Sequence, residues 1–228
     1  MAGASDARGA DAPLAYLTEA AYAGAPAGES TGFVDGGLLR CGVLLRPDVP
    51  MGQLVAAPAV LALGVRDGLL ALGAPSEEVG IGWPDQVVLG EGDQTLAHVS
   101  SKAGYAEGMF VVAAVDVETA KLPPALAHAT PEGLIRALCD GMTARSDAWA
   151  RDSRSSRAKA GPWATFLPEY FDCVPLLGKP VNVCYPNGRV YARGHFVGID
   201  IWGRATVRTK SAGDIEFPPE KFVIRPQE

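Results

Sequence analysis

Two short segments near the middle of the chain combine residue types that can bind a small ligand. Trp83-Pro84-Asp85-Gln86 offers a flat aromatic ring, a carboxylate and an amide, and Leu96-Ala97-His98 follows, with Ser100 two residues further on. An indole can form the wall of a pocket and stack on a flat ligand, and a histidine on an alternating strand can orient a ligand carboxylate. Core packing for Trp83 and a structural role for His98 are the competing interpretations.

Two other residue types could carry chemistry. On an unbroken strand, Leu96, His98, Ser100 and Lys102 share one face and Thr95 points to the other. Lys102 lies beside a glycine turn, where a lysine is usually a solvated charge. Cys41 and Cys139 carry thiols, but Cys139 lies on an apolar helix face, so buried core thiols are the better interpretation.

The elements that would position these residues can be predicted from patterning. Apolar runs and alternation predict strands at 38–45, 79–83, 86–89, 95–101 and 109–117, and helices at 14–22, 51–72 and 130–149. Pro58 indicates a kink or a later start in the second helix, and Thr130-Pro131-Glu132 is a typical helix start. Residues 24–37 are rich in Gly, Pro and Ser and predict a loop.

The chain changes in character near residue 175. Short strands at 179–185, 189–199, 204–210 and 215–217 alternate with tight turns, which predicts a small SH3-like all-β barrel. The sequence therefore predicts an α+β domain over residues 1–174 and a small all-β domain over residues 175–228.

Charge and cysteine usage limit the possible partners. The net charge is −6, and residues 1–144 carry 7 Lys and Arg against 17 Asp and Glu. This acidic field disfavours nucleic acid and does not attract nucleotide phosphates. Four scattered cysteines without metal-ligand spacing predict free thiols, no metal site and a cytoplasmic protein. The first residues resemble no signal peptide, and we expect no membrane association.

The order of these segments resembles the catalytic domain of biotin protein ligases. Those enzymes carry Lys-Trp-Pro-Asn-Asp on a strand after a comparable helix, where this chain has Gly82-Trp83-Pro84-Asp85-Gln86. A lysine followed by Leu-Ala-Gly comes next in the family, and here the stretch is Thr95-Leu96-Ala97-His98. Residues 163–181 resemble the passage into the family's SH3-like domain. The resemblance implies the biotin/lipoate protein-ligase (class II synthetase-like) fold over roughly residues 38–224.

The departures from the family pattern fall on its phosphate-directed residues. The family activates a carboxylate with ATP under a Gly/Arg-rich loop and passes the acyl group to a carrier lysine. In this chain the loop region has only one basic residue, Arg40, which is the candidate cofactor-binding residue. Gly82 and Thr95 stand where the family has lysines, and Lys102 is the candidate to replace them. It lies seven residues beyond Thr95, about 23 Å along a strand, so it would need a bulge or a different register. In the family's octanoyl-transferase branch a lysine and a cysteine transfer the acyl group without ATP, which makes Cys41 and Cys139 candidates in principle, although neither lies in that branch's motif. The resemblance implies ATP, magnesium and biotin or lipoate only if the site is active.

Three functional hypotheses follow. The first is a degenerate ligase that binds a small carboxylate (biotin, lipoate or a fatty acid) without efficient adenylation. The second is an active acyl-transferring ligase that uses Lys102 or another variant residue and attaches biotin or lipoate to a carrier-protein lysine; the basic tract 151–159 could dock such an acidic carrier. The third is a non-catalytic scaffold. Fold analogy alone does not choose among them.

Overall fold

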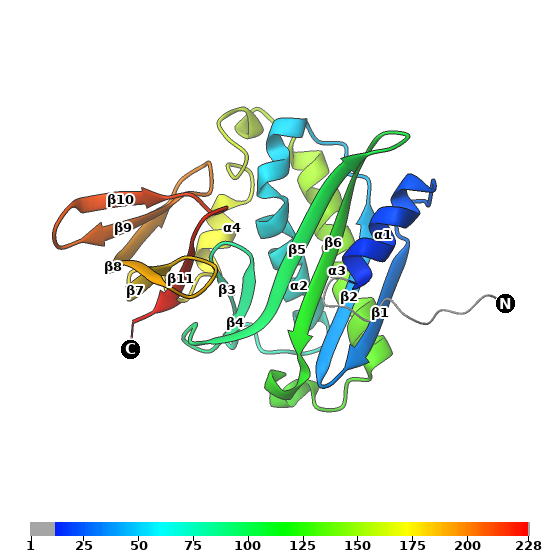
Figure 1. Cartoon of the computed structure of the whole chain (residues 1–228), viewed down its shortest axis with the longest axis horizontal. Coiled ribbons are helices and arrows are strands. Elements are labelled where there is room, and N and C mark those ends of the chain that lie inside the picture. Colours follow the sequence, from blue (N-terminus) through cyan, green and yellow to red (C-terminus); the bar gives the residue numbers. More distant parts are fainter. Residues whose placement is uncertain (1–11, 228) are drawn as a thin grey trace.

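The computed structural model describes residues 12–227 and contains two antiparallel sheets. The first has six strands in the order β1-β2-β6-β5-β4-β3. Its strands are β1 (Ser30–Asp35), β2 (Leu38–Leu45), β3 (Val79–Gly82), β4 (Gln86–Leu89), β5 (Gln94–Tyr105) and β6 (Met109–Glu118). With its helices it forms the expected α+β arrangement, seen at the right of Figure 1.

The helices cover the two faces of this sheet unequally. α2 (Ala57–Ala71) and α3 (Pro131–Asp152) pack together against one face, whose alternating side chains form the main core. α1 (Ala12–Tyr22) crosses the opposite face only at one end, over β2 and β6, where it forms a separate small core (Figure 1). The part of this face around β4 and β5 is left without a covering helix, and we call it the uncovered face.

The start of α2 confirms the expectation for Pro58. Residues Met51–Ala56 form a 3-10 turn, and the α-helix begins at Ala57 with proline in its first turn, where a missing N–H costs least. The segment Met51–Ala71 is apolar and long enough to cross a membrane by composition alone, but 61% of its most apolar window is buried inside the structure. In this fold it is a central core helix.

The start of α3 is also confirmed. Thr130 has an extended backbone, and its Oγ1 accepts a hydrogen bond from the Gly133 N–H at 3.1 Å. Pro131 follows at the first helical position, and Glu132 lies in the first turn. This cap fixes the end of α3 that packs near β1 and β2.

Two strands were not expected. β1 lies inside the segment predicted to be a loop, and pairs with β2 through the two-residue turn Gly36-Gly37. Both glycines have positive φ (57° and 84°), as this hairpin turn requires. β11 (Val223–Pro226) pairs with β7 at the edge of the second sheet.

The second sheet has five strands in the order β10-β9-β8-β7-β11. They are β7 (Pro180–Cys184), β8 (Val190–Ile199), β9 (Ala205–Thr209), β10 (Gly213–Phe217) and β11. The sheet is barrel-like but unclosed, because β10 and β11 remain its edges. A short helix, α4 (Leu167–Asp172), lies between the two sheets (Figure 1).

Candidate functional site

The two segments singled out in the sequence lie side by side. The turn between β3 and β4 carries Trp83, Pro84 and Asp85, and β4 pairs with β5 so that Gln86 lies opposite His98. The Thr95 hydroxyl donates a hydrogen bond to Gln86 Oε1 at 3.1 Å. Both motif segments therefore contribute to one polar patch on the uncovered face.

A β-bulge corrects the expected orientation of the β5 side chains. Val87 pairs with Ala97 but Val88 pairs with Thr95, so Leu96 is an extra residue in the strand. Thr95 consequently shares the uncovered face with His98, whereas Leu96 is buried in the core. The prediction of an unbroken strand, with Leu96 beside His98 and Thr95 opposite, was wrong because a bulge reverses the alternation on one side of it.

Lys102 does not lie close to this patch. It shares the face of His98 and Ser100 but is exposed and pairs with Val112, near the end that α1 covers. Four residues beyond His98 correspond to about 13 Å along a strand. Lys102 is therefore far from the Thr95 position where the resembled ligases carry a lysine.

The cysteines lie on the other side of the sheet. Cys41 on β2 and Cys139 on α3 are buried in the core. A hydrogen bond with Cys139, together with burial, raises the pKa of the Cys41 thiol well above its usual value. The same hydrogen bond lowers the pKa of Cys139. Both thiols are groups of the core, in agreement with the structural interpretation.

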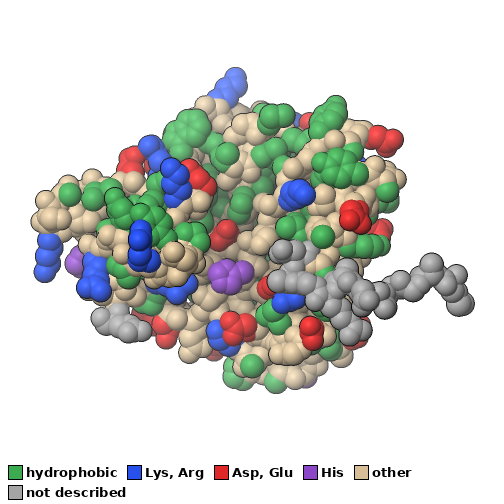
Figure 2. Space-filling view, in the orientation of Figure 1, with side chains coloured by type: hydrophobic (Ala, Val, Ile, Leu, Met, Phe, Trp, Pro, Cys, Tyr) green, Lys and Arg blue, Asp and Glu red, His purple; other side chains and the backbone are tan. Residues whose placement is uncertain are grey.

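Charges on the uncovered face are largely balanced. Arg40 Nε lies 3.6 Å from Asp116 Oδ2, and Lys121 Nζ lies 2.8 Å from Glu118 Oε2 and donates to the Thr95 carbonyl at 3.0 Å. Burial, and secondarily the nearby Arg225, lowers the pKa of His98, which is neutral at pH 7. Figure 2 shows acidic and basic side chains intermixed on this side of the molecule rather than a continuous basic patch.

Trp83 belongs to the core rather than to a pocket wall. Its side chain is 1% exposed, and its Nε1 donates a hydrogen bond to the Gly203 carbonyl at 2.9 Å, so the indole joins the first sheet to the β8–β9 turn. Nearby, the buried Tyr170 hydroxyl on α4 donates to the Pro84 carbonyl at 2.8 Å. These two bonds fix the turn that positions Asp85.

Removing the Tyr170 hydroxyl should therefore loosen this turn. We expect Tyr170→Phe to lower the free energy of unfolding by about 1–3 kcal/mol, because the Pro84 carbonyl loses its partner inside the protein. Urea unfolding measures the change. Tyr105→Phe is the matched control, since Tyr105 is 75% exposed, and an equal loss in both variants would contradict the assigned role.

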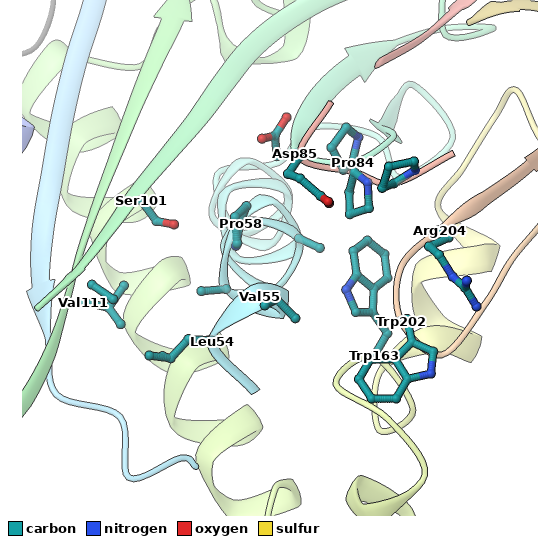
Figure 3. A pocket seen from close by; sticks show the side chains of 16 residues that line it. Leu54, Val55, Pro58, Pro84, Asp85, Ser101, Val111, Trp163, Trp202 and Arg204 are labelled. Atoms are coloured by element: carbon teal, nitrogen blue, oxygen red, sulfur yellow. The ribbon is translucent and has the colours of Figure 1, made fainter. Parts of the chain in front are cut away.

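Asp85 points away from the uncovered face. The Val99 N–H donates to the Asp85 carbonyl at 3.2 Å, so Asp85 continues the pairing with β5 and alternates with Gln86. Its side chain lines a cavity of about 610 Å³ between β5, the start of α2 and the second sheet (Figure 3). Burial raises the pKa of the Asp85 carboxyl to about 6.

The predicted site residues are therefore divided among three places. Gln86, His98, Ser100 and Arg40 lie on the uncovered face, Pro84 and Asp85 line the cavity on the other side, and Trp83, Leu96 and Ala97 are core residues. The sequence did not indicate that residues far apart in the chain would build the cavity. Among these are Val55, Ser101, Trp202, Arg204 and Glu220.

Metal ligation finds no support in the part of the chain that the structure describes. Within residues 12–227, no three His, Cys, Asp or Glu side chains lie close enough together to hold a metal ion.

Comparison with known proteins identifies the fold. No family model matches the chain, and no curated protein matches its sequence. Among solved structures, a biotin protein ligase-like protein of unknown function from Silicibacter sp. TM1040 is similar over 96% of this chain and 92% of its own, with a TM-score of 0.67 and 16% identity.

Biotin protein ligases are also among the similar structures. The enzyme from Aquifex aeolicus in complex with biotin and ATP has a TM-score of 0.60 and 17% identity, over 84% of this chain and 79% of its own. A further structure of the Aquifex aeolicus ligase has a TM-score of 0.61 and 16% identity, over 84% and 83% of the two chains. The chain therefore has the biotin/lipoate protein-ligase-like fold expected from its motifs.

Proposed function

We propose that this protein binds a small carboxylate with an apolar body, of the biotin, lipoate or fatty-acid class, on the uncovered face and does not adenylate it efficiently. The fold is shared with a ligase that was solved in complex with biotin and ATP. The two segments that resemble the ligase motifs meet at Gln86, Thr95 and His98. Neutral donors at His98 and Ser100 suit a carboxylate that is held without strong fixed charge.

The main support for the proposed loss of adenylation is the missing positive charge at Thr95, and two further features agree with it. At the position where the resembled ligases have a lysine, the Thr95 hydroxyl donates to Gln86 and supplies no positive charge. The hairpin that would carry the Gly/Arg-rich loop is closed by the two residues Gly36-Gly37. The nearby basic groups Arg40 and Lys121 lie against carboxylates.

The described residues therefore do not fit Mg-ATP. A triphosphate needs fixed positive charge where negative charge develops during the reaction, and removal of a single such donor costs about 100–1,000-fold in rate. In this chain several of the family's positively charged donors are replaced together, so pyrophosphate release should be undetectable above background.

A thermal-shift and calorimetric titration with biotin, lipoate and octanoate, each with and without Mg-ATP, tests the proposal. An acid at 100 times its Kd should stabilise the fold by about 2.7 kcal/mol. We expect a shift with at least one acid, no increase on adding Mg-ATP and no pyrophosphate. His98→Ala and Ser100→Ala should weaken binding several-fold, whereas His195→Ala, on the exposed side of β8, should not.

The opposite outcomes identify the alternatives. A shift that grows with Mg-ATP, together with pyrophosphate release and acylation of a carrier-protein lysine, would show an active ligase on a variant site. No shift with any acid would overturn the binding proposal in favour of a non-catalytic scaffold.

A further inference from the structure

The cavity beside Asp85 is a separate site from the uncovered face. Its walls are formed by Ser101 and Val111 from the first sheet, Leu54 and Val55 from the 3-10 turn that precedes α2, and Trp202 and Arg204 from the β8–β9 turn (Figure 3). The alternation of β5 places Ser101 on the opposite side of the sheet from His98 and Ser100. A ligand in this cavity therefore does not contact the polar patch of Gln86 and Thr95.

The lining is mainly apolar and aromatic. The volume of about 610 Å³ is that of a small-molecule site. Val55 and Trp202 remain 60% and 53% exposed although they line it, so apolar surface is left available to a ligand. Most of the other lining residues are also apolar, among them Leu54, Pro58, Val111 and Trp163.

The charge inside the cavity is negative. Asp85 and Glu220 line it, and its one basic lining residue, Arg204, is already held by Asp200 at 2.7 Å and by Glu216 at 2.7 Å. The titratable side chains that face or act on Asp85 are thus Glu220, Arg204 and the protonated Tyr170 of α4. None of these supplies a free positive charge to the carboxylate.

We infer that this cavity binds a small organic cation, an ammonium group on an apolar chain or ring, with the cation at Asp85 and the apolar part against Val55 and Trp202. Asp85 is partly buried, and its carboxylate accepts a hydrogen bond from its own backbone. A partly desolvated carboxylate favours an opposite charge close to it, which an ammonium group supplies. An anionic ligand would instead meet Asp85 and Glu220.

The raised pKa of Asp85 gives the binding a defined pH dependence. Because the carboxyl titrates at about pH 6, it is mostly ionised at pH 8 and mostly protonated at pH 5. An alkylammonium has a pKa near that of lysine, about 10.4, and stays charged at both values. Affinity for the cation should therefore rise with pH through this window.

Isothermal titration with three probes of equal chain length tests the inference: hexylammonium, hexanol and hexanoate. At pH 8 we expect hexylammonium to bind at least tenfold more tightly than hexanol, and this ratio to fall several-fold at pH 5. Asp85→Asn should abolish the preference for hexylammonium over hexanol. Asp140 is an exposed aspartate on α3, and Asp140→Asn should leave this preference unchanged. Trp202→Ala, a surface change, should weaken hexylammonium binding several-fold.

Three results would overturn the inference: no preference of the wild-type protein for hexylammonium, tighter binding of hexanoate that depends on Asp85, or an unchanged preference in Asp85→Asn. The wild-type probe series and Trp202→Ala decide the question even if Asp85→Asn does not fold. His98→Ala should not affect hexylammonium, so failure here is distinguishable from failure of carboxylate binding on the uncovered face.

Discussion

Gly141→Ala should destabilise the protein strongly although alanine favours helices. A Cβ at Gly141 would collide with the Gly64 carbonyl oxygen and lie 2.9 Å from the Gly68 nitrogen, both backbone atoms of α2. Backbone cannot rotate away as a side chain can, so α2 and α3 must separate. The cost of overpacking should lie at its usual upper end, about 3 kcal/mol, and the gain in helix propensity is about 1 kcal/mol. We therefore expect a net loss of about 2 kcal/mol in the free energy of unfolding.

Chemical denaturation of the variant measures this loss. Gly52→Ala is the matched control, because an added Cβ there meets no atom within 4 Å, and its effect should stay within about 0.5 kcal/mol. Gly68→Ala, whose Cβ would meet the Ala137 carbonyl, should behave like Gly141→Ala. Equal stability of Gly141→Ala and Gly52→Ala would show that the helices do not cross through these glycines.

The sequence predicts elements whose signals are local and misses those that depend on packing between distant segments. α3 was predictable because its signals are local, in the cap Thr130 and in Pro131. The strand β1 was not, because Gly32 reads as a loop residue. In the structure, a Cβ at Gly32 would lie 2.8 Å from Cys41 Cβ and 2.9 Å from the Ile135 side chain. That glycine is required by packing between distant segments, which no local pattern reveals.

The candidate site was predictable only in part for a similar reason. The pairing of the two motif segments follows from their short separation, and Gln86 does lie opposite His98. The bulge at Leu96 inverted the expected faces, since alternation carries no signal of an inserted residue. β11 ends in Pro226, and proline weakens a strand pattern except at a sheet edge.

The Asp85 cavity had no sequence signature at all. Its lining comes from segments more than a hundred residues apart, including Val55, Asp85 and Trp202. Trp202 lies in a turn beside Gly203, and its exposure is a property of the folded chain that the sequence does not give. Trp83 joins the first sheet to the β8–β9 turn through its bond to Gly203, and such a tertiary contact has no local sequence signal.

Asp85→Asn should stabilise the protein at neutral pH and have little effect in acid. The Asp85 pKa rises from 3.8 to about 6 on folding because burial disfavours the charged form. Between these values the folded state binds more protons than the unfolded chain, so this residue makes stability fall as pH rises. At about 1.4 kcal/mol per pKa unit, the full cost is about 3 kcal/mol above pH 6.

Asparagine has the same shape and cannot ionise, so it removes the pH-dependent cost. We expect the stability difference between Asp85→Asn and the wild-type protein, measured by urea unfolding, to grow by about 2 kcal/mol between pH 4.5 and pH 7.5. The other titrating groups contribute equally to the free energy of unfolding of both proteins, so their contributions cancel in this difference. Asp140→Asn, exposed on α3, should show no such growth, and a pH-independent difference for Asp85→Asn would place its carboxyl in water.

A stabilising substitution at this position would also bear on function. The wild-type residue lowers stability at neutral pH and lies in an open, apolar cavity, and sites that cost stability are typical of binding and catalysis. If a bound cation offsets the cost, hexylammonium should raise the melting temperature of the wild-type protein more at pH 7.5 than at pH 4.5. In Asp85→Asn the same amine should stabilise no more than hexanol does and should lose the dependence on pH, because that variant has no carboxylate for the ammonium group to pair with.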